Sequence, residues 1–310
     1  MRQSPEFLMY RLMEARAVPD PNRIESVDVG RFRALLATRE TSFEQRMGEA
    51  LAVMQIGRRE GASLNDRYAR QSARSLAIRS MGHAAEVSRD PHELESIARM
   101  ILDQRIPVPR QDDTGELANL YHAYRSIILK IAQNPYLSEE AQIRIANTFS
   151  KDALISRTLA QNQNITPRTA RLIANNAKGQ QFVMYALADN ISKQARFGTD
   201  RAQFAQICKE LTTRQVDFPI APAIHGVTDP QHLRMLYVRH AGRSDIERNL
   251  DHATFHAIAQ NPDTPMDVIH NMAREPLPDS VGKESALTQS VIFRRIEEER
   301  GMRQERALEI

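Results

Sequence analysis

The amino-acid sequence predicts an all-α protein: a right-handed α-solenoid of short antiparallel helical hairpins with a helical N-terminal cap. A Leu or Ile stands directly before Ala six times at a constant interval, beginning at positions 117, 131, 145, 159, 173 and 187. Helix stops and starts recur between the pairs, and such a fixed period is typical of repeat architectures. One period corresponds to one helix and two periods to one hairpin. The pairs are Leu117-Ala118, Ile131-Ala132, Ile145-Ala146, Leu159-Ala160, Ile173-Ala174 and Leu187-Ala188.

The region 1–110 is expected to be a helical N-terminal cap without the period. Segments 42–57 and 65–87 have helix-like apolar spacing, and Asp90-Pro91-His92-Glu93 resembles a capped start of a helix running to Leu102. The terminal repeat of such an array must be shielded from water, so we expect this region to cover the end of the array. The stretch from Ile106 to Gly115 holds two prolines and is the expected boundary.

The region 111–285 is expected to be the helical-repeat array. In the unit from Ile131 to Arg144, Asn134-Pro135 ends one helix because proline cannot continue the hydrogen-bond ladder, and Ser138 fits the N-cap of the next. Later units use Asn162 with Thr166-Pro167, and Asn261-Pro262 with Thr264-Pro265. Each unit is expected to be one helix of about ten residues, roughly 15 Å long, followed by a tight turn.

The phrases IAQNPDTPMDVIHNMA, IAQNPYLSEEAQIRIA and LAQNQNITPRTARLIA resemble variant leucine-rich repeats and, more loosely, HEAT-like helical repeats. The resemblance covers about Leu117 to Asn190 and His256 to Glu275. It implies a helical-repeat scaffold and no particular partner, because such arrays serve many functions. The paired Val-Arg segment and the cysteine cluster of that family are not evident in this sequence, so the resemblance implies no cofactor.

The period fades between Ile191 and Leu250, where we expect degenerate repeats with an insertion. Helix starts remain legible at Asp229-Pro230 and Ser244-Asp245, and the segment from Val216 to Gly226 is expected to be an irregular connecting loop. The region 286–310 is expected to be a charged C-terminal helix, since Arg and Glu recur at i, i+4 spacing from Phe293 to Arg306.

Composition indicates a water-soluble protein: 41% of residues are hydrophobic and 26% charged, and no apolar run approaches the roughly 20 residues of a membrane span. The N-terminus has no secretory signal, so cytoplasmic residence is expected, with secretion as a bacterial effector by another route left open. A single cysteine, Cys208, excludes a disulfide framework and a cysteine-based metal site. We expect it to be a buried structural thiol.

The cations are almost all arginine: six lysines among 42 basic residues leave 36 arginines. Guanidinium groups suit phosphate and carboxylate recognition, although codon bias in a GC-rich genome produces the same composition. The 39 acidic residues leave a net charge of only +3, without the strong basic field of many nucleic-acid binders.

Basic residues recur just before the Leu/Ile-Ala pairs: Lys130, Arg144, Arg157 and Arg171. If successive helices alternate between two faces, these residues form two ridges, Lys130 with Arg157 and Arg144 with Arg171, and Arg168 joins the candidate binding set. Such ridges could meet acidic side chains or phosphates; the alternative is that they are solvated positions that keep the array soluble.

His252 and His256 lie four residues apart on an expected helix and are a candidate metal-ligand pair, but position 253 is Ala, so the HExxH glutamate is absent. We find no catalytic constellation and expect neither an enzyme nor a cofactor. The predicted function is that of a non-catalytic protein-binding scaffold or adaptor. A nucleic-acid-binding repeat protein is the alternative and an enzyme on a helical-repeat scaffold the third interpretation; oligomeric state is left open.

Overall fold

The computed structural model describes residues 78, 81–103, 116–213, 221–242, 252–274 and 282–308. Every regular element among them is a helix, which confirms the predicted all-α class. The expected helix at 42–57, most of 65–87, the expected boundary at 106–115 and the expected helix start at Ser244 lie outside these residues. Throughout the described part of the chain, every helix is too short or too polar to cross a membrane.

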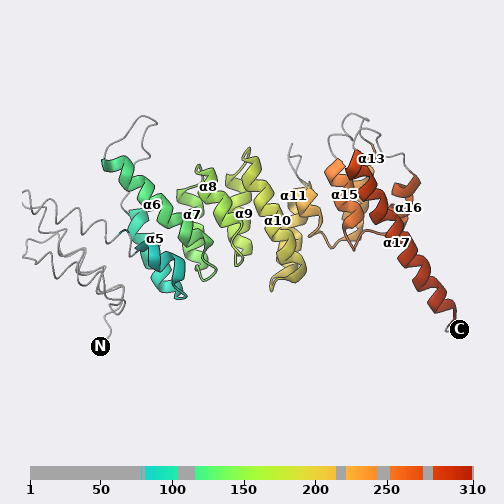
Figure 1. Cartoon of the computed structure of the whole chain (residues 1–310), viewed down its shortest axis with the longest axis horizontal. Helices are drawn as coiled ribbons and strands as arrows, with labels where there is room; N and C mark the ends of the chain where they lie inside the picture. Colours follow the sequence, from blue (N-terminus) through green and yellow to red (C-terminus); the bar gives the residue numbers. More distant parts are fainter. Residues whose placement is uncertain are drawn as a thin grey trace, which may run out of the picture. The chain divides into compact units, whose positions relative to one another are not determined.

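The chain forms two compact units, Met1–Phe149 and Ser150–Ile310. In the first unit, α5 contacts both α6 and α7, and the same two helices contact each other (Figure 1). Apolar side chains of all three helices form its core, including Leu94, Ile97, Ile128, Ile131 and Ile145. The helices are α5 (Pro91–Asp103), α6 (Glu116–Gln133) and α7 (Glu139–Thr148).

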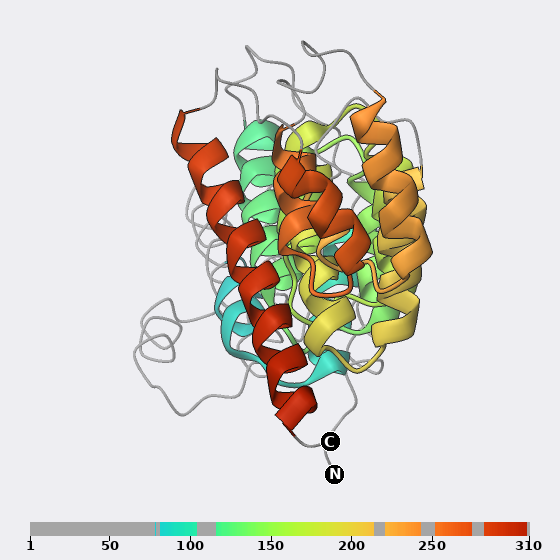
Figure 2. The same ribbon diagram turned by 90° about the vertical axis from the view of Figure 1, so that its right-hand side faces the viewer.

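In the second unit, helices contact both their neighbours and the next helix but one: α8 packs against α10, α9 against α11, and α10 against α12 (Figure 1). The longest helix, α17, packs against α15 and α16 (Figure 2). The helices are α8 (Ala153–Ala160), α9 (Pro167–Asn176), α10 (Gln181–Phe197), α11 (Arg201–Thr213), α12 (Ala221–Ile224), α13 (Pro230–Ala241), α15 (His252–Gln260), α16 (Met266–Arg274) and α17 (Gly282–Leu308).

The Leu/Ile-Ala pairs are core residues, since both members of every pair from Ile131 to Ala188 are buried. Helices α7, α8 and α9 hold one pair each, as expected, and have eight to ten residues. The expectation of a turn in every unit is wrong at both ends of the series. Leu117 and Ile131 lie in the same 18-residue helix, and α10 continues for 17 residues through the pair at Leu187.

Most predicted helix starts are confirmed. The hydroxyl of Ser138 accepts the N–H of Ala141, Thr166 caps α9 with Pro167 in its first turn, and Asp229 caps α13. Thr264 acts differently: α16 begins at Met266, and the Thr264 hydroxyl donates to the Ile258 carbonyl of the preceding helix at 2.6 Å. The segment from Val216 to Gly226, expected to be an irregular loop, includes a short helix, α12. Residues 216–220 of this segment are outside the described range.

Two asparagines, each three residues after the Leu or Ile of a pair, link their helix to the end of an earlier helix. The Asn134 amide donates to the carbonyls of Ala85 and Ser88, at 3.0 Å each, and the Asn190 amide donates to those of Ala160 and Asn162, at 2.8 and 2.7 Å. These bonds satisfy carbonyls at the ends of preceding helices, which have no partner within their own helix. Asn134 and Asn190 therefore each fix the position of one helix against the end of another.

Candidate interaction surface

Two of the predicted basic residues, Lys130 and Arg144, belong to the first unit. The Lys130 ammonium donates to the Glu86 carboxylate at 2.8 Å and lowers the pKa of that carboxyl below its ordinary value. Arg144 is half-buried on α7. Lys130 is thus already engaged by a carboxylate of its own chain.

The other three, Arg157, Arg168 and Arg171, belong to the second unit. Arg168 and Arg171 lie on α9, where Arg171 approaches Glu210 of α11 at 3.8 Å, whereas Arg157 is exposed on α8. Each proposed ridge has one member in each unit, so the ridges stay a prediction. Of the predicted set, Arg157 is the exposed cation around which other outward-facing residues gather.

Helices α8 and α10 run parallel to each other. The Gln180 side chain, at the start of α10, donates to the Ser150 carbonyl just before α8, at 3.0 Å. Ten positions further along, Asn190 donates to Ala160 at the end of α8, at 2.8 Å. The two helices are therefore aligned at both ends of α8. Residues that stand at the same position along α8 and along α10 are direct neighbours.

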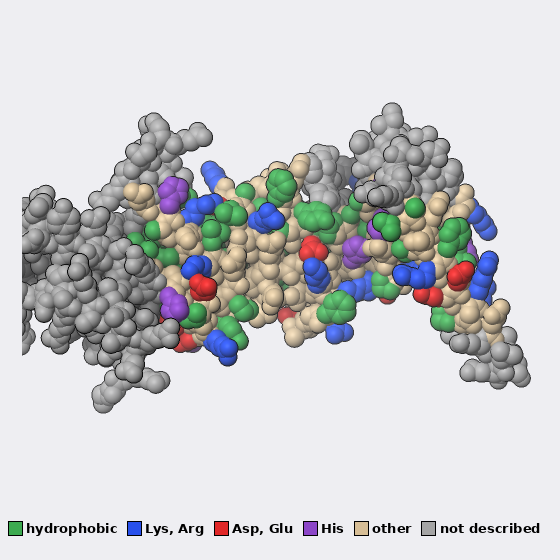
Figure 3. Space-filling view, in the orientation of Figure 1, with side chains coloured by type: hydrophobic (Ala, Val, Ile, Leu, Met, Phe, Trp, Pro, Cys, Tyr) green, Lys and Arg blue, Asp and Glu red, His purple; other side chains and the backbone are tan. Residues whose placement is uncertain are grey.

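This register aligns four outward-facing residues, which we call the α8–α10 surface: Leu154 and Arg157 on α8, Phe182 and Tyr185 on α10. Phe182 occupies the place in α10 that Leu154 has in α8, two periods earlier in the sequence, and Tyr185 corresponds to Arg157 in the same way. The exposed fractions are 45% for Leu154, 77% for Phe182 and 53% for Tyr185. Figure 3 shows hydrophobic and basic side chains interspersed over the middle helices on the face drawn. Neighbouring exposed apolar side chains of this size often mark an interaction site.

The segment that carries this surface is basic. Residues 150–213 hold nine Lys or Arg against four Asp or Glu, whereas the other described segments of the second unit hold nine against eight. Three of the four acids already have a role: Asp152 caps α8, Asp189 pairs with Lys193, and Glu210 lies near Arg171.

Four exposed cations of this segment have no carboxylate partner among the described residues: Lys151, Arg157 and Lys178, which lie on or beside α8 and α10, and Arg201 at the start of α11. Lys151 and Lys178 lie in the turns that lead into α8 and α10, and the bond from Gln180 to Ser150 brings these two turns together. The N-terminal ends of both helices add positive potential at the same edge. Gln180 makes no side-chain cap bond at the start of α10.

Sequence reasoning identified Arg157 but missed Leu154, Phe182 and Tyr185. Helical periodicity carries a signal for them, because Ile155 and Val183 are buried and the preceding residue of each helix points outward. Nothing in the sequence distinguishes such positions from single exposed apolar residues, which are common. The parallel packing of α8 and α10 is what makes them neighbours.

The candidate metal ligands are involved in other contacts. His252 is buried, and the Nδ1 atom of His256 lies 2.8 Å from the Thr288 hydroxyl. Within the described ranges, no three His, Cys, Asp or Glu side chains are grouped as metal ligands. Cys208 is buried, as expected, and burial raises the pKa of its thiol to about 12.

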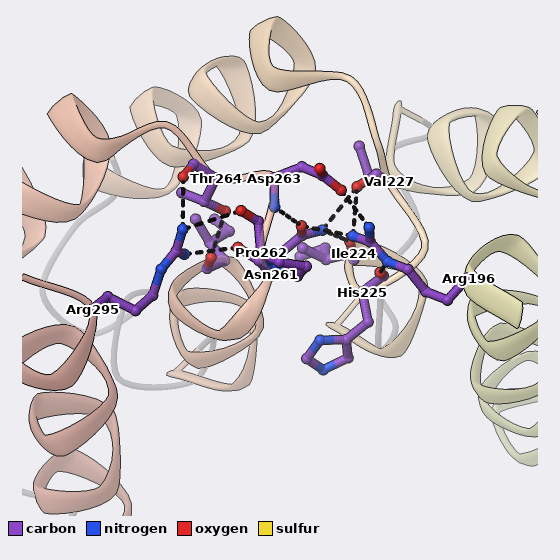
Figure 4. A network of polar contacts seen from close by, with 10 residues as sticks. Arg196, Ile224, His225, Val227, Asn261, Pro262, Asp263, Thr264 and Arg295 are labelled. Carbon is purple, nitrogen blue, oxygen red and sulfur yellow. Dashed lines mark hydrogen bonds and ion pairs between the residues drawn. The ribbon is translucent and has the colours of Figure 1, made fainter. Parts of the chain in front are cut away.

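A polar network that the sequence did not reveal joins α10 to the turn after α15 (Figure 4). The Arg196 guanidinium donates to the carbonyls of His225 and Val227, at 2.7 and 3.2 Å, and to the Asn261 side chain at 2.8 Å. It also pairs with the Asp263 carboxylate. Because its charge is matched by Asp263 and four hydrogen bonds tie it to its own chain, Arg196 stabilises the fold.

No protein-family model matches the chain, and comparison with curated proteins and with solved structures finds no match either. The α8–α10 surface is therefore interpreted from its own geometry and charge.

Proposed function

We propose that this chain is a non-catalytic protein-binding scaffold, a right-handed α-solenoid of helical hairpins that binds another protein through the α8–α10 surface. The repeated buried pairs and the side-chain bonds between repeats support the solenoid. Repeat arrays stack short helices into extended surfaces, and their outward positions are free to vary without loss of the core.

One observation carries the proposal: three large apolar side chains and an arginine lie together on parallel helices and face outward. Aromatic residues and arginine are the types most enriched among residues that dominate binding energy at protein interfaces. Comparable outward positions of the neighbouring helix α11 hold polar residues, such as Gln203 and Gln206.

Site-specific photocrosslinking tests the proposal. A photoreactive phenylalanine analogue is placed at Phe182, and the cross-linked products from cells of the source organism are identified by mass spectrometry. The matched control position is Phe293 on α17, which is also an exposed phenylalanine. We expect a discrete protein adduct at 182 that is lost when Arg157→Glu is added. Identical adducts at both positions would contradict the proposal.

Binding of nucleic acid is the second candidate, because exposed aromatic rings beside cations also suit base stacking and phosphate contact. Only three cations near the surface lack a carboxylate partner within the described ranges, so few phosphates could be neutralised. With three contacts, the affinity for duplex DNA would change with salt with a log–log slope of about −2.7. Binding of oligo(dT) or duplex DNA with a much steeper slope would favour this candidate over protein binding.

A further inference from the structure

The α8–α10 surface has a definite geometry. Packed helices lie about 8–10 Å apart, so Leu154 and Phe182 are separated by roughly 10 Å across the two helices. Arg157 and Tyr185 lie three positions further along, a rise of about 4.5 Å. The surface is thus a small rectangle with apolar side chains at three corners and a guanidinium at the fourth.

Most of the charge around this rectangle is positive; the acid at the near edge, Asp152, accepts the N–H groups of Leu154 and Ile155 as the N-cap of α8. Lys151 and Lys178 stand at the edge where α8 and α10 begin, and Arg157 is one turn further along. Towards the far end, the nearest acid is Asp189 on α10, whose carboxylate is matched by Lys193 at 2.7 Å. A ligand that complements this surface carries negative charge near Arg157 and towards the two lysines.

We infer that the surface binds an acidic segment of a partner protein, in which two apolar side chains about 10 Å apart flank a carboxylate; this inference rests on the protein-binding function proposed above. The apolar side chains cover Leu154 and Phe182. The carboxylate accepts two parallel hydrogen bonds from Arg157, a pairing that the planar guanidinium favours. Further acidic residues of the segment meet Lys151 and Lys178.

Two backbone conformations satisfy this spacing. A polyproline II segment places residues i and i+3 on one edge about 9 Å apart, and a helix spans about 10.5 Å between i and i+7. The aliphatic side chain of Leu154 favours a peptide over a nucleic acid, because stacking on bases uses flat aromatic rings. The small number of unmatched cations also fits one or two carboxylates better than a run of phosphates.

Peptide selection tests the inference. Random peptides long enough to hold two helical turns on either side of the carboxylate are displayed on phage and selected on the immobilised full-length chain, and the affinities of enriched peptides are measured by fluorescence anisotropy. We expect an excess of Asp and Glu and two apolar residues at i, i+3 or i, i+7. Arg157→Glu and Phe182→Ala should each weaken binding at least about tenfold. The matched exposed substitutions on α17, Arg300→Glu and Phe293→Ala, should change affinity less than about twofold.

A charge exchange separates the electrostatic contact from a general effect on the fold. A peptide whose acidic residues are replaced by Lys should bind the Arg157→Glu variant better than it binds the wild type. All variants are compared with the wild type by circular dichroism, and because all four substituted residues are exposed, unchanged helicity is expected.

The outcomes are distinguishable. Enriched peptides without acidic residues, whose binding is still lost in Phe182→Ala, would overturn the inference and leave the proposed function standing. Peptide binding and cross-linking that are both indifferent to the surface variants would overturn both. Tighter binding of oligo(dT) than of any peptide, lost in Arg157→Glu, would replace the protein partner by a nucleic acid. A dimer in light scattering that Phe182→Ala dissociates would identify a second copy of this chain as the occupant.

Discussion

Replacing Asn261 by Ala should strongly destabilise the second unit. Asn261 is fully buried, and its amide donates to the carbonyls of Ile224 and Val227, at 2.5 and 2.9 Å. Its side-chain oxygen accepts the backbone N–H of Asp263 and the guanidinium of Arg196, both at 2.8 Å. One small side chain therefore completes four hydrogen bonds that alanine cannot make.

The size of this loss in stability depends on which hydrogen-bond partners of Asn261 keep another bond. Each hydrogen bond contributes about 0.5–1.5 kcal/mol net, and a buried group left without a partner costs about 1–3 kcal/mol. The Val227 carbonyl keeps its bond from Arg196, and Arg196 keeps two carbonyls and the Asp263 carboxylate, so part of the loss is recovered. We expect Asn261→Ala to lower the free energy of unfolding by about 3–4 kcal/mol.

Urea unfolding followed by circular dichroism measures this loss. With a slope of about 2 kcal/mol per molar, the midpoint of the affected transition should fall by about 1.5–2 M. Hydrogen exchange should show lost protection at the Asp263 amide. The exposed control Gln203→Ala should stay within about 0.5 kcal/mol of the wild type. A loss below about 1 kcal/mol for Asn261→Ala would show that these four hydrogen bonds do not hold the turn after α15 in place.

Three other expectations concern packing, thiol chemistry and pH. Gly226→Ala should destabilise the fold by about 2–3 kcal/mol in urea unfolding, because the added Cβ would lie 2.5 Å from the Cys208 sulfur. Gly301 has open space around it, so Gly301→Ala should stabilise α17 by about 0.8 kcal/mol. Equal effects of the two substitutions on the free energy of unfolding would contradict this expectation. The Cys208 thiol, with a pKa of about 12, should resist iodoacetamide at pH 8 until urea unfolds the chain, and rapid labelling of the native chain would disprove its burial. Burial lowers the pKa of His225 and His232, so the unfolded chain takes up protons below about pH 6.5 while the folded chain resists them. The free energy of unfolding should therefore fall as the pH drops from about 7.5 to about 5.5, and less steeply in His225→Gln. A midpoint of urea unfolding that does not change over this range would exclude a contribution of these histidines to stability.

Helix type and most helix starts could be predicted because they depend on neighbouring residues. Ser138 and Thr166 cap the helices that follow them, as their chemistry requires, and Pro167 occupies a first-turn position where its missing N–H is harmless. The lengths of α6 and α10 could not be predicted from the period. The period is close to four turns of an α-helix, so a continuous helix and a helix followed by a turn both return the Leu/Ile-Ala pair to the same face.

The candidate surface could be predicted only in part, because it depends on which helices are neighbours. Arg157 stood out through its place before a buried pair, but Leu154 and Phe182 are far apart in the sequence and neither is unusual alone. Their proximity follows from the parallel packing of α8 and α10, which the side chains of Gln180 and Asn190 fix. A tertiary arrangement thus turns scattered residues into one surface.

The hydrogen bonds that link α10 to the end of α8 have a counterpart at α17, where a different residue type makes them. Asn190 stands three residues after buried Leu187 and donates to the carbonyls of Ala160 and Asn162. Arg295 likewise stands three residues after buried Ile292 of α17.

Arg295 donates to the equivalent carbonyls of Ala259 and Asn261, at 3.0 and 2.7 Å, and also to those of Pro262 and Thr264, at 3.2 and 3.0 Å (Figure 4). The longer guanidinium reaches twice as many carbonyls as an amide, at the helix that ends the described chain. The strict period of Leu/Ile-Ala pairs ends at Leu187, whereas hydrogen bonds of this kind occur as late as Arg295. Because an asparagine side chain can supply at most two of these four bonds, Arg295→Asn should lower hydrogen-exchange protection across α15 and α17, while Arg300→Asn leaves it unchanged. Full protection in Arg295→Asn would mean that apolar packing alone, without these bonds, holds α17 against α15.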